Sequence, residues 1–164
     1  MAPISLAGWS LHRRFLRQDD ERLLLTDFAK LSKDEFGIGA LELNSPFFAS
    51  LDDAYIAELK SIADGEGVEM LNIAIDGQGD LASADQATRD EAVTMHARWF
   101  PVAAALGCNA VRANTGGHGD SDEAVLPRCT ESFGKLAELG KPHGITIIIE
   151  NHGGLSANPD NVVK

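Results

Sequence analysis

Five short apolar runs alternate with longer amphipathic stretches along the chain. Each run spans only a few residues and is bounded by Gly, Asn, Asp or Ser, a pattern typical of buried β-strands. The predicted strands are Ile4–Trp9, Ile38–Leu43, Val68–Ile75, Asn109–Ala113 and Ile145–Glu150.

The stretches between these runs carry apolar residues at helical spacing, and three of them stop at a glycine, as helices commonly do. Thr26 is expected to cap the first long helix, and a proline after Asn158 is expected to open a final turn. The predicted helices are Asp27–Phe36, Ala54–Asp64, Ala84–Leu106 and Glu123–Leu139.

Strand followed by helix, repeated along the chain, predicts an α/β fold with a parallel sheet and right-handed crossovers. A doubly wound nucleotide-binding sheet requires a glycine fingerprint after its first strand, and residues 10–15 contain no glycine. We therefore expect a (β/α) TIM barrel. Because eight units take about 250 residues, residues 1–164 are expected to form a single partial TIM-barrel domain of about five strands with outer helices, the N-terminal part of a longer barrel.

Side chains alternate between the two faces of a strand, so the sequence predicts which residues point into the barrel. On this parity Glu42, Arg112 and Glu150 lie inward near the ends of their strands, and the parity continues to His152. Active sites of barrels form at the carboxyl ends of the strands. The helix-facing residues are predicted to be Leu41, Leu43, Ile145, Ile147 and Ile149, and a further inward set is predicted to be Asn72, Ala74 and Asp76.

These residues also have structural interpretations. Glu150 could simply mark the point where a strand reaches water, and Arg112 could be a structural partner of Glu42 or Glu150, since buried charges are normally paired. Trp9 is expected to pack within the barrel rather than to form a platform for a sugar. The histidines expected to face solvent are His12, His96, His118 and His143.

Composition narrows the classes of function. The formal net charge of −11 disfavours nucleic acid as a partner, and no apolar run approaches the roughly 20 residues that span a bilayer. The N-terminus does not read as a signal peptide. Cys108 and Cys129 are too few for a disulfide framework and are expected in or near the core. We therefore expect a cytoplasmic protein with no membrane partner.

The segment from Ile147 to Ser156, which contains Glu-Asn-His-Gly-Gly and is followed by Asn158-Pro159, resembles the xylose-isomerase-like TIM-barrel superfamily. It is most similar to the sugar phosphate isomerase/epimerase branch, which also includes inosose dehydratases and ketose 3-epimerases. Phe36–Asn44 and Leu106–Asn114 match the second and fourth units of that branch.

The resemblance implies a carbohydrate substrate and one divalent cation held by two glutamates, an aspartate and a histidine. Glu150 matches the first of these metal ligands and one of two acid/base carboxylates, whereas the other three ligands would follow Lys164. Glu42, Arg112 and His152 match positions near the substrate, with Arg112 as the counter-charge if the substrate is anionic. Oxygen ligands suit Mn²⁺ or Mg²⁺, and a histidine also admits Zn²⁺ or Co²⁺. Such a cation would stabilise the enediolate formed by proton transfer next to a carbonyl.

Two other functions stay open. One is a DNA repair enzyme similar to endonuclease IV, which requires several metals, many histidines and a basic groove. The other is a half-barrel without chemistry. A five-stranded arc also leaves the edges of its first and last strands unpaired, together with an inward face that we expect to include Leu6, Val111 and Ile148. Apolar strand edges invite pairing, so self-association is expected.

Overall fold

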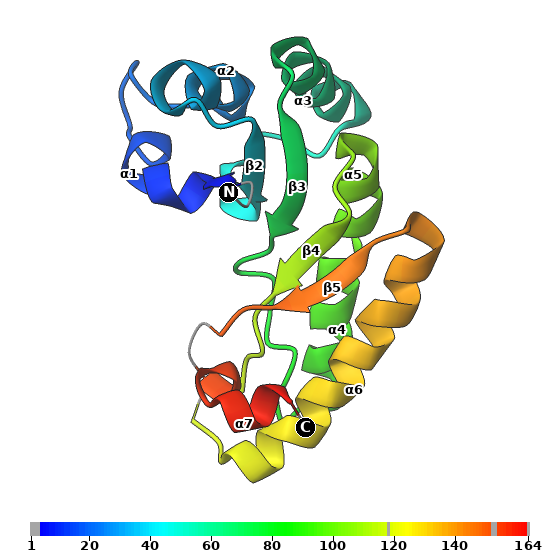
Figure 1. The fold of residues 1–164 in the computed structure, drawn as a ribbon. Coiled ribbons are helices and arrows are strands. Elements are labelled where there is room, and N and C mark those ends of the chain that lie inside the picture. The colour runs from blue at the N-terminus through cyan, green and yellow to red at the C-terminus, as the bar shows by residue number, and fades with distance from the viewer. Residues whose placement is uncertain (1–3, 118, 152–153, 164) are drawn as a thin grey trace.

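The computed structural model describes residues 4–117, 119–151 and 154–163. Its core is one parallel five-stranded sheet in the order β1-β2-β3-β4-β5, as predicted from the alternation of strands and helices. The sheet is curved and forms part of a (β/α) barrel (Figure 1). The strands are β1 (Leu6–Ala7), β2 (Ala40–Asn44), β3 (Glu69–Ala74), β4 (Ala110–Ala113) and β5 (Thr146–Ile149).

Helices connect consecutive strands, and the longer ones follow the outside of the sheet (Figure 1). Within the described residues, no helix is both long and apolar enough to cross a membrane. The α-helices are α1 (His12–Phe15), α2 (Leu25–Phe36), α3 (Asp53–Glu66), α4 (Gln86–Ala97), α5 (Trp99–Leu106), α6 (Asp122–Gly140) and α7 (Pro159–Val162). Short 3-10 helices are η1 (Gly8–Leu11), η2 (Ser45–Phe47), η3 (Lys141–His143) and η4 (Gly154–Ala157).

The first strand is shorter than the predicted Ile4–Trp9, because the chain leaves the sheet at Gly8 and turns into η1. The backbone N–H of Trp9 donates to Oδ1 of Asn44 at 2.8 Å instead of extending the ladder. A Cβ on Gly8 would lie 2.9 Å from that oxygen, so the close approach requires glycine.

Two helix predictions were wrong in detail. The long stretch Ala84–Leu106 forms two helices that meet at Arg98, because Pro101 has no N–H to donate to the carbonyl four residues earlier. Thr26 does not cap α2, which begins one residue earlier. There the carboxylate of Asp27 accepts the N–H of Leu24 at 3.2 Å, so the acidic side chain stabilises the helix start.

The core lies between the sheet and the outer helices. Leu41, Leu43 and Ile145 are buried there, as parity predicted. Leu6 and Val111 were expected on the inward face, but they are only 9% and 1% exposed and belong to the same core. The register explains the correction, since Leu6 pairs with Leu41 and Val111 pairs with Ile73 and Ile147, so each shares the helix-facing side.

The expectation that His96 faces solvent was also wrong. His96 follows Ala92 and Val93 on the core side of α4 and is 3% exposed. Its Nδ1 lies 2.8 Å from the carbonyl oxygen of Ala92, and burial lowers the pKa of the imidazole. The two cysteines are buried as predicted, and burial raises the pKa of the Cys108 thiol to about 12.

Acidification from pH 7 to pH 5 should therefore destabilise the fold through His96. The unfolded chain takes up a proton as the pH falls through about 6.5, whereas the buried imidazole of the folded chain resists protonation. The free energy of unfolding therefore decreases as the pH falls, by up to about 1.4 kcal/mol per pH unit. Urea unfolding at pH 7 and pH 5 should show that the free energy of unfolding depends less on pH in His96→Leu than in the wild type. The exposed His143→Gln serves as the control, and an unchanged slope in His96→Leu would contradict the assignment.

Candidate active site at the carboxyl ends of the strands

A cavity of about 420 Å³ opens where the strands end. It brings together Glu42, Arg112 and Glu150, the three described residues that strand parity placed at this mouth. Its lining consists of Ala7, Trp9, Ser10, Glu42, Asn44, Asp76, Arg112 and Glu150.

Arg112 lies at the centre of the polar contacts in this cavity. Only 8% of it is exposed, and its Nη1 lies 2.9 Å from Oδ1 of Asp76. Its Nε lies 3.1 Å from Oε2 of Glu150. Among the described residues no ion pair joins Arg112 to Glu42. Of the two predicted partners, Arg112 therefore pairs with Glu150, and Asp76 is a second partner. A buried guanidinium requires such partners, because an unpaired buried charge is costly.

Asn114 completes this network. Its Oδ1 accepts from Nη1 of Arg112 at 2.9 Å, and its Nδ2 donates to Oδ1 of Asp76 at 3.1 Å. The carboxamide therefore joins the cation to its counter-ion and fixes the side chain of Arg112 at the end of β4.

Glu150 follows β5 directly and keeps 47% of its side chain exposed. Ile147 and Ile149 face the groove beside α6, whereas Glu150 lines the cavity on the opposite side of the sheet. This confirms the parity prediction for its placement. The hydroxyl of Ser156 donates to the backbone carbonyl of Glu150 at 2.8 Å, which anchors the backbone where the strand ends.

Glu42 reaches the same cavity from β2. Its neighbours Leu41 and Leu43 are buried in the core, so alternation turns the carboxylate of Glu42 to the inward side. In register it lies beside Ala7 of β1 and Asn72 of β3.

Trp9 was expected to pack within the barrel, but its side chain lines the cavity and the residue is 50% exposed. Its ring stacks on Phe47 with 5.6 Å between the ring centroids and on His12 with 5.5 Å. The turn into η1 therefore places the indole at the cavity rather than in the core.

The loops after β3 and β4 are fastened to each other by Asp80. Its Oδ1 accepts the N–H groups of Gly117 and Ala82, each at 2.9 Å. Gly116 has φ of 69°, and a Cβ at this position would lie 2.0 Å from the same carboxylate oxygen. The glycine pair therefore lets the second loop close over Asp80.

Glu150 is the only predicted metal ligand that these residues provide. Within the described part of the chain, no three His, Cys, Asp or Glu side chains gather closely enough to hold an ion. His152, predicted near the substrate, lies outside the described residues, and its role stays a prediction.

Parallel strands in sequential order with helices outside define a partial TIM barrel. The sequence profile of the xylose isomerase-like TIM barrel family matches residues 30–162. The chain belongs to this family.

Solved structures support the same fold. A D-tagatose 3-epimerase-like protein matches with a TM-score of 0.68 at 20% identity, over 79% of this chain and 51% of its own. A D-psicose 3-epimerase determined with D-fructose matches with a TM-score of 0.65 at 18% identity, over 80% of this chain and 47% of its own.

The IOLI protein, determined with a bound zinc atom, matches with a TM-score of 0.61 at 15% identity, over 75% of this chain and 45% of its own. The chain thus spans about half the length of the structures that it resembles. No curated protein matches it in sequence.

Proposed function

We propose that this chain forms part of an isomerase or epimerase that acts on a sugar, sugar phosphate or related polyol by proton transfer next to a carbonyl. The observation that supports it most is the carboxylate of Glu150, held beside the buried Arg112 in a cavity at the carboxyl ends of the strands. The family is described as xylose isomerase-like, and two structures with this fold are named for sugar epimerisation.

In this proposal Glu150 is a catalytic residue that removes or returns the proton. Arg112 contacts Glu150 through Nε at 3.1 Å and keeps the carboxylate directed into the cavity. The carboxylate of Glu42 lines the same cavity and would accept hydrogen bonds from substrate hydroxyls, with Arg112 and His152 also near the substrate. A general base of this kind typically contributes about 10²–10⁴-fold to the rate.

We further propose a divalent cation, Mn²⁺ or Mg²⁺ with Zn²⁺ or Co²⁺ as further candidates, for which Glu150 would supply one carboxylate ligand. The zinc atom in the IOLI structure supports a metal for proteins of this fold. Because the described residues form no group of three ligands, they do not by themselves fit a complete cation site. Among the described residues, the proposal therefore assigns the proton transfer to Glu150 alone.

The alternative functions are less well supported. A DNA repair role requires a basic groove, whereas the chain carries a net charge of −11. Among the described residues, the cavity lining contains one cationic side chain, Arg112. A half-barrel without chemistry is favoured only by the single metal ligand among the described residues.

We also propose that the protein acts in the cytoplasm. The thiols of Cys108 and Cys129 are not joined in a disulfide, which agrees with a compartment where thiols stay reduced.

Proton exchange in D₂O tests the proposed function directly. A protein that contains this chain in a closed barrel, supplied with Mn²⁺, is incubated with ketoses and their phosphates, and deuterium at the carbon next to the carbonyl is measured by NMR. Enzyme-dependent incorporation is expected for at least one substrate. Incorporation that is no faster than without protein, across the whole panel, would overturn the proposal.

We also propose that the 164-residue chain self-associates through the free edge of β5. Among the described strands β5 pairs only with β4, and Ile148 and Ile149 are 38% and 41% exposed. Beside them lies an apolar groove of about 430 Å³ against α6. The two-residue β1 offers a much shorter edge than expected. The proposal therefore has a second copy of the chain pair with β5 rather than with β1.

Light scattering at high micromolar concentration should show a species larger than the monomer. Ile148→Lys should shift the chain toward the monomer, because a charge on an edge strand opposes pairing. Leu139→Lys on α6, where the leucine is 46% exposed, is the control. A stable wild-type monomer would count against this contact.

A further inference from the structure

We propose that the cavity binds an uncharged polyhydroxy compound and discriminates against its phosphorylated form. The inference rests on the proposed function and narrows its substrate class. Three features carry it: the contacts that Nη1 and Nε of Arg112 already make, the contact of Asp80 with the glycine loop, and the balance of charge in the lining.

Among the described residues, Arg112 is the only cation that lines the cavity. Its Nη1 and Nε already face partners and only Nη2 is left, so either pair of parallel N–H groups that includes Nη2 also includes a nitrogen in use. Nη1 donates to Asp76 and Asn114, each at 2.9 Å, and Nε faces Glu150 at 3.1 Å. A phosphate is best bound by two parallel N–H groups of a guanidinium. Such binding would require Arg112 to break contacts with carboxylates that the fold places beside it.

The second place where an anion could bind is the loop after β4. Gly116 and Gly117 both have positive φ, and glycine-rich turns can present backbone N–H groups to an anion. In this chain Oδ1 of Asp80 already accepts the N–H of Gly117 at 2.9 Å. An internal carboxylate thus takes the place of an external phosphate.

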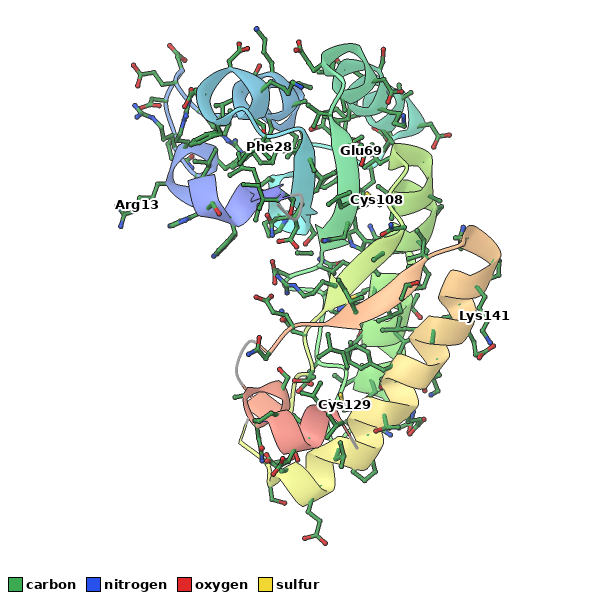
Figure 2. The ribbon with its side chains drawn as sticks, viewed as in Figure 1. Arg13, Phe28, Glu69, Cys108, Cys129 and Lys141 are labelled. Carbon is green, nitrogen blue, oxygen red and sulfur yellow. The ribbon has the colours of Figure 1, made fainter. Side chains whose placement is uncertain are left out.

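The charge of the lining adds to these two features. Within the described part of the lining, Glu42, Asp76 and Glu150 contribute three carboxylates against the single guanidinium of Arg112. Free carboxylate oxygens accept hydrogen bonds from hydroxyl groups but repel a phosphate. Arg13 of α1 does not compensate, because it is exposed and its side chain points away from the strands (Figure 2).

Ligand binding to the 164-residue chain tests the inference, with D-fructose, D-fructose 6-phosphate and inorganic phosphate as probes. The chain has two tryptophans, and only Trp9 lines the cavity, so its ¹⁵N-labelled indole signal reports occupancy. Trp99→Phe is needed only to assign the two signals. Fructose should shift the Trp9 signal with a dissociation constant on the order of millimolar. Fructose 6-phosphate should bind about tenfold more weakly or worse, and inorganic phosphate should leave the signal unchanged.

Asp76→Asn removes one negative charge from the lining, so the preference for fructose over its phosphate should narrow about threefold or more. Glu138→Gln on the outer surface of α6 is the matched control and should preserve the preference. Equal or tighter binding of fructose 6-phosphate by the wild-type chain, or no shift with any probe, would overturn the inference.

The two experiments distinguish a failure of the proposed function from a failure of the inferred ligand class. Deuterium exchange confined to phosphorylated ketoses would leave the isomerase proposal standing and overturn the substrate class. Fructose binding at Trp9 without deuterium exchange on any ketose would do the reverse, since it supports the ligand class and contradicts the chemistry.

Discussion

Replacing Glu150 by glutamine in a closed barrel that contains this chain is expected to lower turnover about 10²–10⁴-fold or more. The amide keeps the size of the side chain but cannot take up the proton, and it is a weaker ligand for a cation. Removal of the carboxylate acts on the chemical step, so kcat should fall much more than substrate affinity.

The fold should tolerate this substitution. The side chain of Glu150 is 47% exposed, and Arg112 retains Asp76 and Asn114 as partners. Circular dichroism and urea unfolding should therefore stay close to those of the wild type. Glu138→Gln, at an exposed position on α6, is the control and should keep full activity.

The 164-residue chain itself should be nearly inert, because its described residues offer the carboxylate of Glu150 but no group of three metal ligands. The measurement is steady-state turnover of ketoses and their phosphates with added Mn²⁺. Full activity in Glu150→Gln, or turnover by the 164-residue chain equal to that of the closed barrel, would show that the assignment of Glu150 is wrong.

The order of the sheet and the placement of Glu42, Arg112 and Glu150 were predictable from the sequence alone. Both follow from regular geometry, since side chains alternate along a strand and consecutive βα units lie side by side. The residues are also anchored by strongly apolar neighbours, such as Leu41 and Leu43 around Glu42. Because both leucines point into the core, the side chain of Glu42 must point to the opposite face of the sheet.

Trp9 and Asp76 were harder to predict because their placement depends on irregular backbone. Trp9 follows a strand that ends early, where its N–H donates to the side-chain oxygen of Asn44 instead of to the next strand. Alternation gave Asp76 only as one member of an inward set with Asn72 and Ala74. It follows β3, whose register with β2 shifts between Leu41 and Glu42. Contacts between residues far apart in sequence leave no periodic pattern that would reveal them.

The electrostatics of Arg112 were predictable only in part. The sequence offered Glu42 or Glu150 as a structural partner, and the resemblance implied a counter-charge for an anionic substrate, whereas the structure shows Glu150 together with Asp76. The distances of 2.9 Å and 3.1 Å depend on three separate strands and loops coming together. A residue type and a strand position thus predict where a charge lies, but only the folded chain shows what neutralises it.

A row of aromatic rings connects the core beneath α2 to the cavity. Phe28 is fully buried, and the edge of the Phe15 ring meets it at 5.3 Å and 84°. Phe15 stacks on Phe47 at 4.3 Å, and Phe47 in turn stacks on Trp9 in the cavity lining. Packing within the core therefore positions an aromatic side chain of the candidate site.

Phe28→Ala should lower the free energy of unfolding by about 3–5 kcal/mol, the usual cost when a buried aromatic side chain is removed and leaves a cavity. Urea unfolding at pH 7, followed by circular dichroism, measures this loss. Phe36→Ala is the matched control, because it removes the same ring from the same helix at a position that is 45% exposed. Its effect should stay near 0.5 kcal/mol, the approximate range for surface positions.

The same pair of variants separates stability from the geometry of the cavity. Loss of the Phe28 ring removes a support of Phe15, and the stacked series transmits that change to Trp9. The indole signal of Trp9 should therefore shift in folded Phe28→Ala and stay unchanged in Phe36→Ala. Equal losses of stability in the two variants would contradict the burial assigned to Phe28. A large loss without movement of the Trp9 signal would instead show that the rings stabilise the core without positioning the cavity lining.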